Sequence, residues 1–380
     1  MAKSIVACVR CESYNRETVL KAVDRGIDLL GGIDQFVSPG EKILLKPNVL
    51  AGDPPEKAVT THPSILYAAG KLFLKKTDKV SYGDSPGSGD PAVQLKAAAL
   101  TEPAEELGLE LADFRKGIEK TFRDSPFTKR FLIAEGALEA DGIISLCKMK
   151  THSYTRVTGA VKNQFGCIPG NPKKGFHLKL PSGHDFSKML VALTLFLKPR
   201  LYIMDGITAM EGNGPRGGNP KEMNIILLSR DPVAMDAVMC RCIDLNPEYV
   251  PTMKPGKDWG LGTYLEDEIT LIGDPIEDFV NTSFNVNRKP YKEAFPTGMM
   301  AFAKNLVIPR PVIDFSKCVM CGICVQSCPV TPKALNWKKG RTSEPPVYKY
   351  IRCIRCYCCQ EICPEGAISV KKSAFSPLGE

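Results

Sequence analysis

The sequence lacks any apolar run long enough to cross a membrane. Its longest apolar stretch covers residues 189–197, far below the roughly 20 residues that a spanning helix needs. The chain also opens without a charged segment, an apolar stretch and a cleavage site, and it passes at once into a strand-like run at 5–8, so we expect no secretory signal. Many cysteines and no export signal together predict a reducing, cytoplasmic location without a membrane partner.

Nucleotide-binding signatures are missing as well. No strand is followed by a GxGxxG turn and there is no Walker loop, which argues against a nicotinamide or nucleoside triphosphate site of the usual kind. No helix-turn-helix, RNA-binding aromatic signature or zinc finger is present. The net charge of +8 therefore does not predict a nucleic-acid partner.

The positive charge is concentrated in two segments. Residues 148–188 carry eight Lys and Arg against one acid, and residues 314–372 carry ten against four. A concentrated positive field raises the local concentration of anionic ligands or acidic partners.

Cysteine is the residue that the sequence has in excess, with 15 in 380 residues. Eight of them form two copies of one run, Cys318-x2-Cys321-x2-Cys324-x3-Cys328-Pro329 and Cys353-x2-Cys356-x2-Cys359-x3-Cys363-Pro364. This is the ligand run of a two-cluster bacterial ferredoxin, in which the fourth cysteine of each run binds the other cluster.

We therefore expect two 4Fe–4S clusters. One is assigned to Cys318, Cys321, Cys324 and Cys363, and the second to Cys353, Cys356, Cys359 and Cys328. A pair of zinc sites is the alternative, but zinc takes Cys-x2-Cys pairs at longer separation. Cys358 breaks the regular spacing and is interpreted as a spare.

The remaining cysteines carry weaker signals. Cys8 and Cys11 lie in a strand-like segment, where residues three apart point to opposite faces and do not chelate together. Small buried side chains are the expected role of Cys147 and Cys167.

Before the cysteine runs, short β-rich stretches alternate with amphipathic ones. Strands are expected at 5–9, 43–46, 80–83, 142–146, 201–204, 224–228 and 269–272. Helices are expected after Asn15 (a good cap), from Thr61 with Pro63 in the first turn, and near Asp231. This alternation predicts an α/β fold with a mostly parallel sheet covered by helices over 1–285, a connector over 286–312 and a small ferredoxin-like α+β module over 313–372.

Polar motifs follow four of the expected strands. They are Lys46-Pro47-Asn48 with His62, then Asp84-Ser85-Pro86-Gly87, then Lys148-Met149-Lys150-Thr151-His152, and finally Asp205-Gly206 with Glu211 and the glycine-rich stretch 212–218. Ligands of open parallel sheets bind at the carboxyl ends of the strands. The four motifs therefore predict one site at that edge.

These residues also resemble a known family, the domain of unknown function three-six-two, often fused to ferredoxin modules. The similarity runs through Lys46-Pro47-Asn48, Thr61-His62-Pro63, Gly83 to Gly87, Lys150-Thr151-His152, Thr158 to Gly166 with Lys162 and Asn163, and Asp205-Gly206 with Glu211-Gly212. The resemblance implies an iron–sulfur protein with oxidoreductase character and supplies no substrate.

Each candidate residue also has a purely structural interpretation. His62 and His152 are candidates for moving protons, with Lys150 beside them, yet a histidine before proline also caps a helix. Lys46, Asn48, Asp84, Lys148, Lys162, Asn163 and Glu211 are candidates for binding an anion or a metal, although lysines also form plain surface charge and acids hold turns. His177 and His184 are expected in an exposed loop.

Three functions compete. The first is an oxidoreductase that takes electrons from a low-potential donor such as ferredoxin or flavodoxin and passes them to an anionic substrate or cofactor, with a flavin or an additional metal left open. The second is an electron-transfer or adaptor subunit that docks an acidic redox partner. The third is a metal- or cluster-delivery protein that uses Cys8, Cys11 and Cys358.

Overall fold

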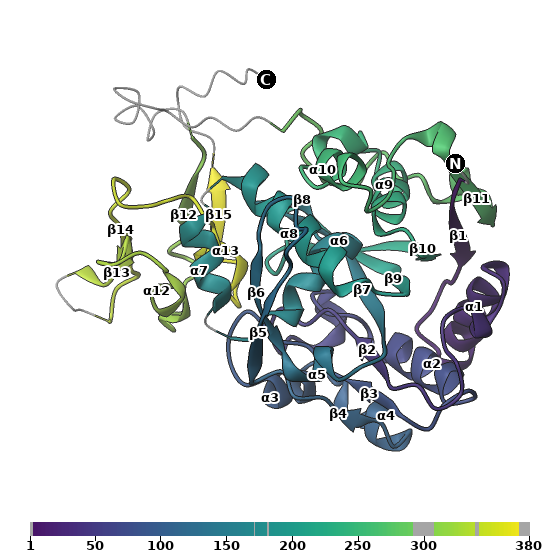
Figure 1. The fold of residues 1–380 in the computed structure, drawn as a ribbon. Helices are drawn as coiled ribbons and strands as arrows, with labels where there is room; N and C mark the ends of the chain where they lie inside the picture. The colour runs from purple at the N-terminus through teal and green to yellow at the C-terminus, as the bar shows by residue number, and fades with distance from the viewer. Residues whose placement is uncertain (1–2, 171, 181, 292–307, 339–341, 372–380) are drawn as a thin grey trace.

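The computed structural model describes the chain except for residues 1–2, 171, 181, 292–307, 339–341 and 372–380 (Figure 1). A mixed sheet forms its centre, with the strand order β11-β1-β10-β9-β7-β2-β3-β4 and β8 paired to β7. These strands are β1 (Ser4–Arg10), β2 (Ile43–Lys46), β3 (Val80–Tyr82), β4 (Glu110–Leu111), β7 (Gly142–His152), β8 (Arg156–Val157), β9 (Leu201–Glu211), β10 (Asn219–Ser229) and β11 (Ile269–Gly273).

The part of the sheet that bears the polar motifs is parallel, as the sequence predicts. Strand β2 pairs in parallel with β3 and β7, and β7 pairs in parallel with β9. The expected strand 224–228 lies in β10, which runs antiparallel to both β9 and β1. The reason is local: β9 and β10 are joined by the short turn 212–218, which forms a hairpin, whereas a parallel return needs a long crossover.

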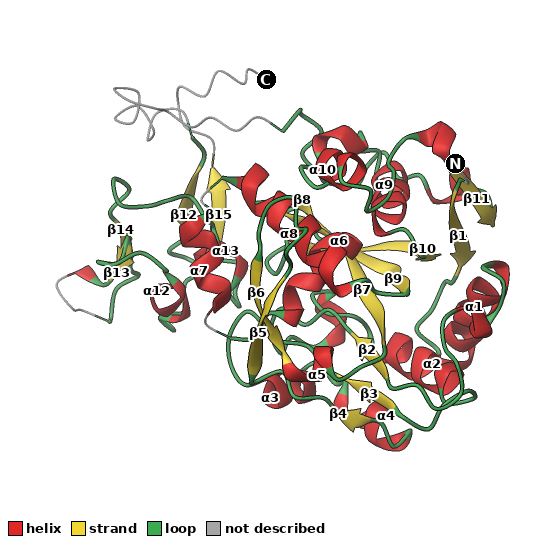
Figure 2. Cartoon of the chain, viewed as in Figure 1, coloured by secondary structure: helices red, strands yellow, loops and turns green. Residues whose placement is uncertain are grey.

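Helices cover both faces of this sheet (Figure 2). Residues of α1 (Arg16–Leu29), α2 (Pro63–Phe73) and α4 (Thr101–Glu106) pack into the apolar core on one face. Residues of α6 (Gly159–Asn163), α8 (Gly183–Leu197) and α9 (Pro232–Cys242) pack into the core on the other. The mostly parallel, helix-covered α/β architecture is therefore confirmed.

The expected helix starts are confirmed by their caps. Asn15 Oδ1 accepts hydrogen bonds from the backbone N–H groups of Glu17 and Thr18 at 3.0 and 3.2 Å. Asp231 caps α9 in the same way, and α2 begins with Pro63 after His62. Side-chain acceptors of this kind satisfy backbone donors that have no partner within the helix.

Several elements fall outside the sequence prediction. Strands β5 (Gly117–Thr121) and β6 (Arg130–Ala134) form an antiparallel hairpin beside the main sheet. The shorter helices α3 (Pro91–Ala97), α5 (Glu135–Leu138), α7 (Pro172–Lys179) and α10 (Met253–Asp258) complete this part.

The cysteine-rich module, residues 310–371, lies at one end of the molecule (Figure 1). It contains β12 (Arg310–Ile313) paired antiparallel to β15 (Ile368–Lys371), β13 (Leu335–Asn336) paired to β14 (Val347–Tyr348), and the short helices α12 (Ile323–Ser327) and α13 (Cys358–Glu361). Most of the expected connector, residues 292–307, lies outside the described residues. Strand β12 starts at Arg310, ahead of the predicted start of the module at 313.

The glycine-rich turn 212–218 holds the module against the sheet edge. Gln360 Nε2 donates to the side-chain oxygen of Asn213 at 2.9 Å and to the carbonyl of Gly214 at 3.1 Å. Arg216 donates from one guanidinium nitrogen to the carbonyl of Ile362 at 2.5 Å and from Nε to Asp53 at 2.8 Å. The turn that the sequence analysis placed with the polar motifs therefore serves as a docking surface for α13.

Candidate functional site

Two strands continue beyond the points where the sequence analysis ended them. Strand β7 runs to His152 instead of 146, and β9 runs to Glu211 instead of 204. Cys147 and Met149 face the apolar core, so the alternation of the strand carries on through the polar motif. Lys148, Lys150 and His152 are consequently buried side chains on a strand rather than members of an exposed loop.

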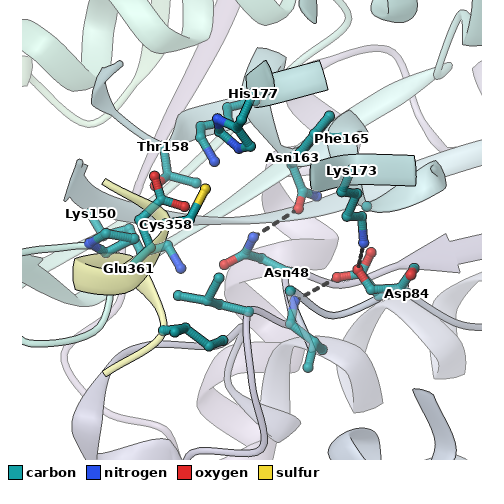
Figure 3. A pocket seen from close by; sticks show the side chains of 18 of the residues that line it. Asn48, Asp84, Lys150, Thr158, Asn163, Phe165, Lys173, His177, Cys358 and Glu361 are labelled. Carbon is teal, nitrogen blue, oxygen red and sulfur yellow. Dashed lines mark hydrogen bonds between the residues drawn. The ribbon is translucent and has the colours of Figure 1, made fainter. Parts of the chain in front are cut away.

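A strand-edge cavity lies where β2, β3 and β7 end and α13 of the cysteine-rich module covers them. Its volume is about 100 Å³. Figure 3 shows Lys150, Thr158, Cys358 and Glu361 on one side, Asp84 and Lys173 on the other, and Asn48 between them. The other wall residues include Val49, Leu50, Ser85, Lys162, Asn163, Phe165, His177, Pro215 and Ile362.

A buried network fixes the wall formed by β2 and β3. Lys46 Nζ lies 2.8 Å from Asp84 Oδ1 and 3.3 Å from Asn163 Oδ1. Asp84 Oδ2 accepts from the backbone N–H of Val49 at 2.7 Å, and Asn48 Nδ2 donates to Asn163 Oδ1 at 3.2 Å. Because both charges are paired, Lys46 and Asp84 shape the wall rather than offer free charge to a ligand.

Three further lysines line the cavity without a carboxylate in contact. Lys150 Nζ donates to the carbonyl of Val59 at 2.6 Å, and Lys173 Nζ donates to the carbonyls of Ser85 and of Pro86, the latter at 3.0 Å. Lys162 Nζ makes no hydrogen bond or ion pair within the described residues and lies 6.0 Å from the centre of the Phe165 ring. Burial, helped by the neighbouring lysines, lowers the pKa of both Lys150 and Lys173 to about 7 and also lowers that of Lys162.

His152 touches the cavity through Glu361. Its Nδ1 accepts hydrogen bonds from the backbone N–H groups of Tyr154 and Thr155 at 3.0 and 3.3 Å, so the proton of the neutral ring lies on Nε2. That atom is 3.3 Å from Glu361 Oε1, a contact too poorly aligned for a hydrogen bond. Burial and the nearby Lys162 and Lys150 hold the His152 pKa well below its usual value.

His62 and Lys148 belong to a different group, the buried polar cluster of Tyr14, His62, Lys148 and Asp205. Lys148 Nζ donates to Asp205 Oδ2 at 2.7 Å and Tyr14 donates its hydroxyl to Asp205 Oδ1 at 2.8 Å. His62 Nδ1 caps α2 by accepting from the N–H of Ser64 at 3.2 Å, and its ring stacks on Tyr14. None of the four lines the strand-edge cavity.

Glu211 also lies elsewhere. Its Oε2 accepts from the backbone N–H of Asn285 at 2.8 Å, so this carboxylate ties β9 to the segment that follows β11. Among the described residues, no three His, Cys, Asp or Glu side chains are gathered so as to hold a single metal ion.

The structure adds residues that sequence reasoning missed. His177 was expected in an exposed loop, but it lies on α7, is buried and stacks on Phe186 with ring centres 4.5 Å apart. Burial lowers its pKa to about 3, so the ring is neutral. The Nδ1 of His177 and the hydroxyl of Thr158 have no hydrogen-bond partner within the described part of the chain. The sequence signal that could have placed His177 on a helix is the helical spacing of the nearby apolar residues Phe176 and Leu180.

Cys358 also lines the cavity, although its sequence position only marked it as a spare. Glu361 sits three residues later on the same short helix, and nothing in the sequence singled it out. A short helix between ligand cysteines is too brief for periodicity to reveal which side chains face inward.

The backbone of the two cysteine runs repeats itself. Met320 and Arg355, each just before the second cysteine of its run, have φ of 58° and 63°, and Gly322 and Tyr357, each just after it, have φ of 74° and 58°. Turns of this kind gather N–H groups around anionic groups, iron–sulfur clusters included. The repeated backbone therefore suits a repeated anionic group.

The cysteine side chains also suit cluster binding. Cys318, Cys321, Cys324 and Cys363 line one cavity, so both runs contribute to it. Cys353, Cys356 and Cys359 are buried, and the Tyr348 hydroxyl lies 3.2 Å from Cys359 Sγ. All eight thiols are free. The four thiols gathered in this cavity fit a cubane cluster, which needs four thiolates.

The six cysteines of the α/β part are buried free thiols. Cys8 lies within β1, and burial raises its pKa to about 12 and that of Cys11 to about 11. Burial also raises the pKa of Cys167 to about 12 and that of Cys147 well above its usual value.

Comparisons with known proteins agree with this organisation. The family model described as "Domain of unknown function (DUF362)" matches residues 43–241, and a model of a 4Fe–4S dicluster domain matches residues 310–364. Thylakoid-associated protein sll1697 of Synechocystis sp. is 35% identical over 264 residues, which is 69% of this chain and 81% of that protein. The lactate racemase apoprotein of Thermoanaerobacterium thermosaccharolyticum aligns with a TM-score of 0.36 and 13% identity, over 61% of this chain and 55% of that one.

No helix in the described part of the chain is long and apolar enough to pass through a bilayer. The cytoplasmic location stays a prediction.

Proposed function

Because this chain belongs to the DUF362 family and carries a 4Fe–4S dicluster domain, we propose that it is an iron–sulfur oxidoreductase acting on a small anionic substrate or cofactor in the strand-edge cavity. Two clusters, one held by Cys318, Cys321, Cys324 and Cys363 and one by Cys353, Cys356, Cys359 and Cys328, would supply single-electron transfer.

The observation that carries the proposal is the position of α13. This helix contains Cys359, a ligand of the second cluster, and the same helix presents Cys358 and Glu361 to the strand-edge cavity. A molecule in the cavity therefore lies beside the chain segment that would hold iron. Desolvated sites of this kind also exclude water from reactive groups.

The residues of the α/β part then have distinct tasks. Lys162 binds the anion with its free ammonium group, and Asn48, fixed by Asn163, orients it. Lys150, whose pKa is about 7, holds a proton that it can release at neutral pH. His152 positions Glu361 through the 3.3 Å contact between its Nε2 and Glu361 Oε1.

The direct test uses anaerobically reconstituted protein. Dithionite should bleach the cluster absorbance, and an anionic metabolite that is a substrate should restore it within the time of mixing. Lys150→Met should slow that reoxidation about tenfold or more, as for loss of a proton donor, whereas the exposed Lys188→Met should not. Failure of every member of a broad anionic panel to reoxidise the reduced protein would refute the proposal.

A second candidate is an electron-transfer subunit without chemistry of its own. Cys321 is exposed, and beside it Phe315 and Val319 are 64% and 57% exposed, as expected where a redox partner such as a low-potential ferredoxin or flavodoxin docks. In that case Lys150→Ala and His152→Ala would leave electron transfer to a purified partner unchanged. The same variants abolish turnover if the cavity is the active site.

A further inference from the structure

Among the described residues, the side chains that line the strand-edge cavity carry an excess of positive charge. Three lysines line the cavity, namely Lys150, Lys162 and Lys173. The carboxylates among its described lining residues are Asp84 and Glu361, and Asp84 is already paired with Lys46. Three ammonium groups against one carboxylate leave an excess of two positive charges when all four are ionised. Like charges in a partly desolvated space repel one another strongly.

Polar groups without partners mark where a ligand would make contact. The hydroxyl of Thr158, Nδ1 of His177 and Oδ1 of Asn48 make no hydrogen bond within the described residues. Thr158 and His177 are only 4% and 6% exposed. Buried polar atoms are nearly always paired, and an unpaired one costs free energy. Several of them around one cavity indicate a missing ligand.

The rest of the wall is apolar. Val49, Leu50, Phe165 and Ile362 all line the cavity beside the lysines. A bare inorganic ion would leave these side chains facing water, whereas a ligand with a carbon skeleton would cover them.

We infer that the strand-edge cavity binds a compact organic dianion, a dicarboxylate or a phosphate monoester, through Lys162 together with Lys150 and Lys173. This inference rests on the proposed function, because it names the chemical class of the ligand at the same site. The two charges balance the excess of the cavity, and Thr158 donates to one of the anionic groups.

Binding should also draw protons from solution. The pKa values of Lys150 and Lys173 are about 7, so both are largely neutral at pH 8. A neighbouring anion favours the ammonium form and raises both pKa values. Dianion binding at pH 8 is therefore accompanied by proton uptake.

The experiment is isothermal titration of the full, cluster-loaded chain under anaerobic conditions. The probes are succinate, glycerol 3-phosphate, inorganic phosphate and the monoanion butyrate, each in two buffers of different ionisation enthalpy. We expect an organic dianion to bind about tenfold or more tightly than butyrate, with a measured enthalpy that depends on the buffer. The dicarboxylate and phosphate arms distinguish the two sources of the dianion.

Variants test the residues. Lys162→Gln should weaken dianion binding about tenfold or more, Lys162→Arg should restore part of it, and Lys188→Gln, on the exposed side of α8, should bind like the wild type. Cluster absorbance and circular dichroism confirm that each variant is loaded and folded.

Three results would overturn the inference: an affinity for butyrate equal to that for both organic dianions, no binding of any dianion, or unchanged dianion affinity in Lys162→Gln with a shifted cluster reduction potential. The last would mean that the lysines balance the cluster charge. Dianion binding without any reoxidation of the clusters would sustain this inference and refute the proposed function. Reoxidation of the clusters by a monoanion, without tighter binding of dianions, would sustain the proposed function and refute this inference.

Discussion

Replacing Lys148 by methionine should strongly destabilise the α/β part. The Lys148 and Asp205 side chains are 1% and 0% exposed and their charged atoms are 2.7 Å apart. Removing one partner of a buried ion pair costs about 3–5 kcal/mol because the other charge stays buried. Asp205 still accepts from the Tyr14 hydroxyl and from the His62 N–H, so we expect the lower end, about 3 kcal/mol.

The assay is urea unfolding followed by the fluorescence of Trp259, which lies at the end of α10, in a Trp337→Phe background. With the free energy of unfolding falling by about 3 kcal/mol per molar urea, the midpoint urea concentration should fall by roughly 1 M. The exposed pair of Lys254 and Asp258, 2.8 Å apart, is the matched control, and Lys254→Met should cost less than about 0.5 kcal/mol.

A second variant isolates the cause. Adding Asp205→Asn to Lys148→Met removes the stranded charge and keeps a group of the same shape, so it should recover about 1 kcal/mol or more. If Lys148→Met unfolded within about 1 kcal/mol of the wild type, the ion pair would not be holding β7 and β9 together and the reasoning would fail.

Three other predictions concern pH, docking and the clusters. Burial lowers the His62 pKa from 6.5 to about 4, so the unfolded state takes up the proton first as pH falls. The free energy of unfolding should therefore fall by up to about 1.4 kcal/mol per pH unit between pH 6.5 and 4. In urea titrations at several pH values, His62→Asn, which keeps a capping side chain, should flatten that slope. A Cβ on Gly217 would lie 2.7 Å from backbone of the cysteine-rich module while one on Gly175 meets open space, so Gly217→Ala should increase the radius of gyration and Gly175→Ala should not. Cys363→Ala should lose about half of the iron measured per chain, whereas Cys358→Ala should keep all of it, and equal iron in both would contradict the assignment of Cys363 as a cluster ligand.

The sequence predicted the elements whose signals are local. Apolar spacing and a capping side chain are properties of a few neighbouring residues, so the start of α1 after Asn15 and of α9 after Asp231 followed directly. The cysteine runs are local in the same sense, because a cubane cluster sets the spacing of its ligands within one short segment.

Prediction failed where polarity was taken for the end of a strand. Lys148, Lys150 and His152 suggested a loop after 146, yet Cys147 and Met149 between them continue the alternation into the core. A buried strand tolerates lysine when the ammonium group finds an acceptor, as Lys148 does in Asp205. That acceptor comes from another strand, and no local pattern reveals it.

The sequence by itself determined that this chain has a helix-covered, mostly parallel sheet and a tail with the cysteine spacing of iron–sulfur proteins, because periodicity and ligand spacing act over short distances. Only the tertiary structure decided which of the polar side chains share a site. It separated His62, Lys148 and Glu211 from Lys150, Lys162 and Asn163, and it added Lys173, His177 and Glu361. The physical reason is that the cavity is closed by α13, and the packing of α13 on the sheet edge depends on contacts such as Gln360 with Asn213, between residues far apart in the chain.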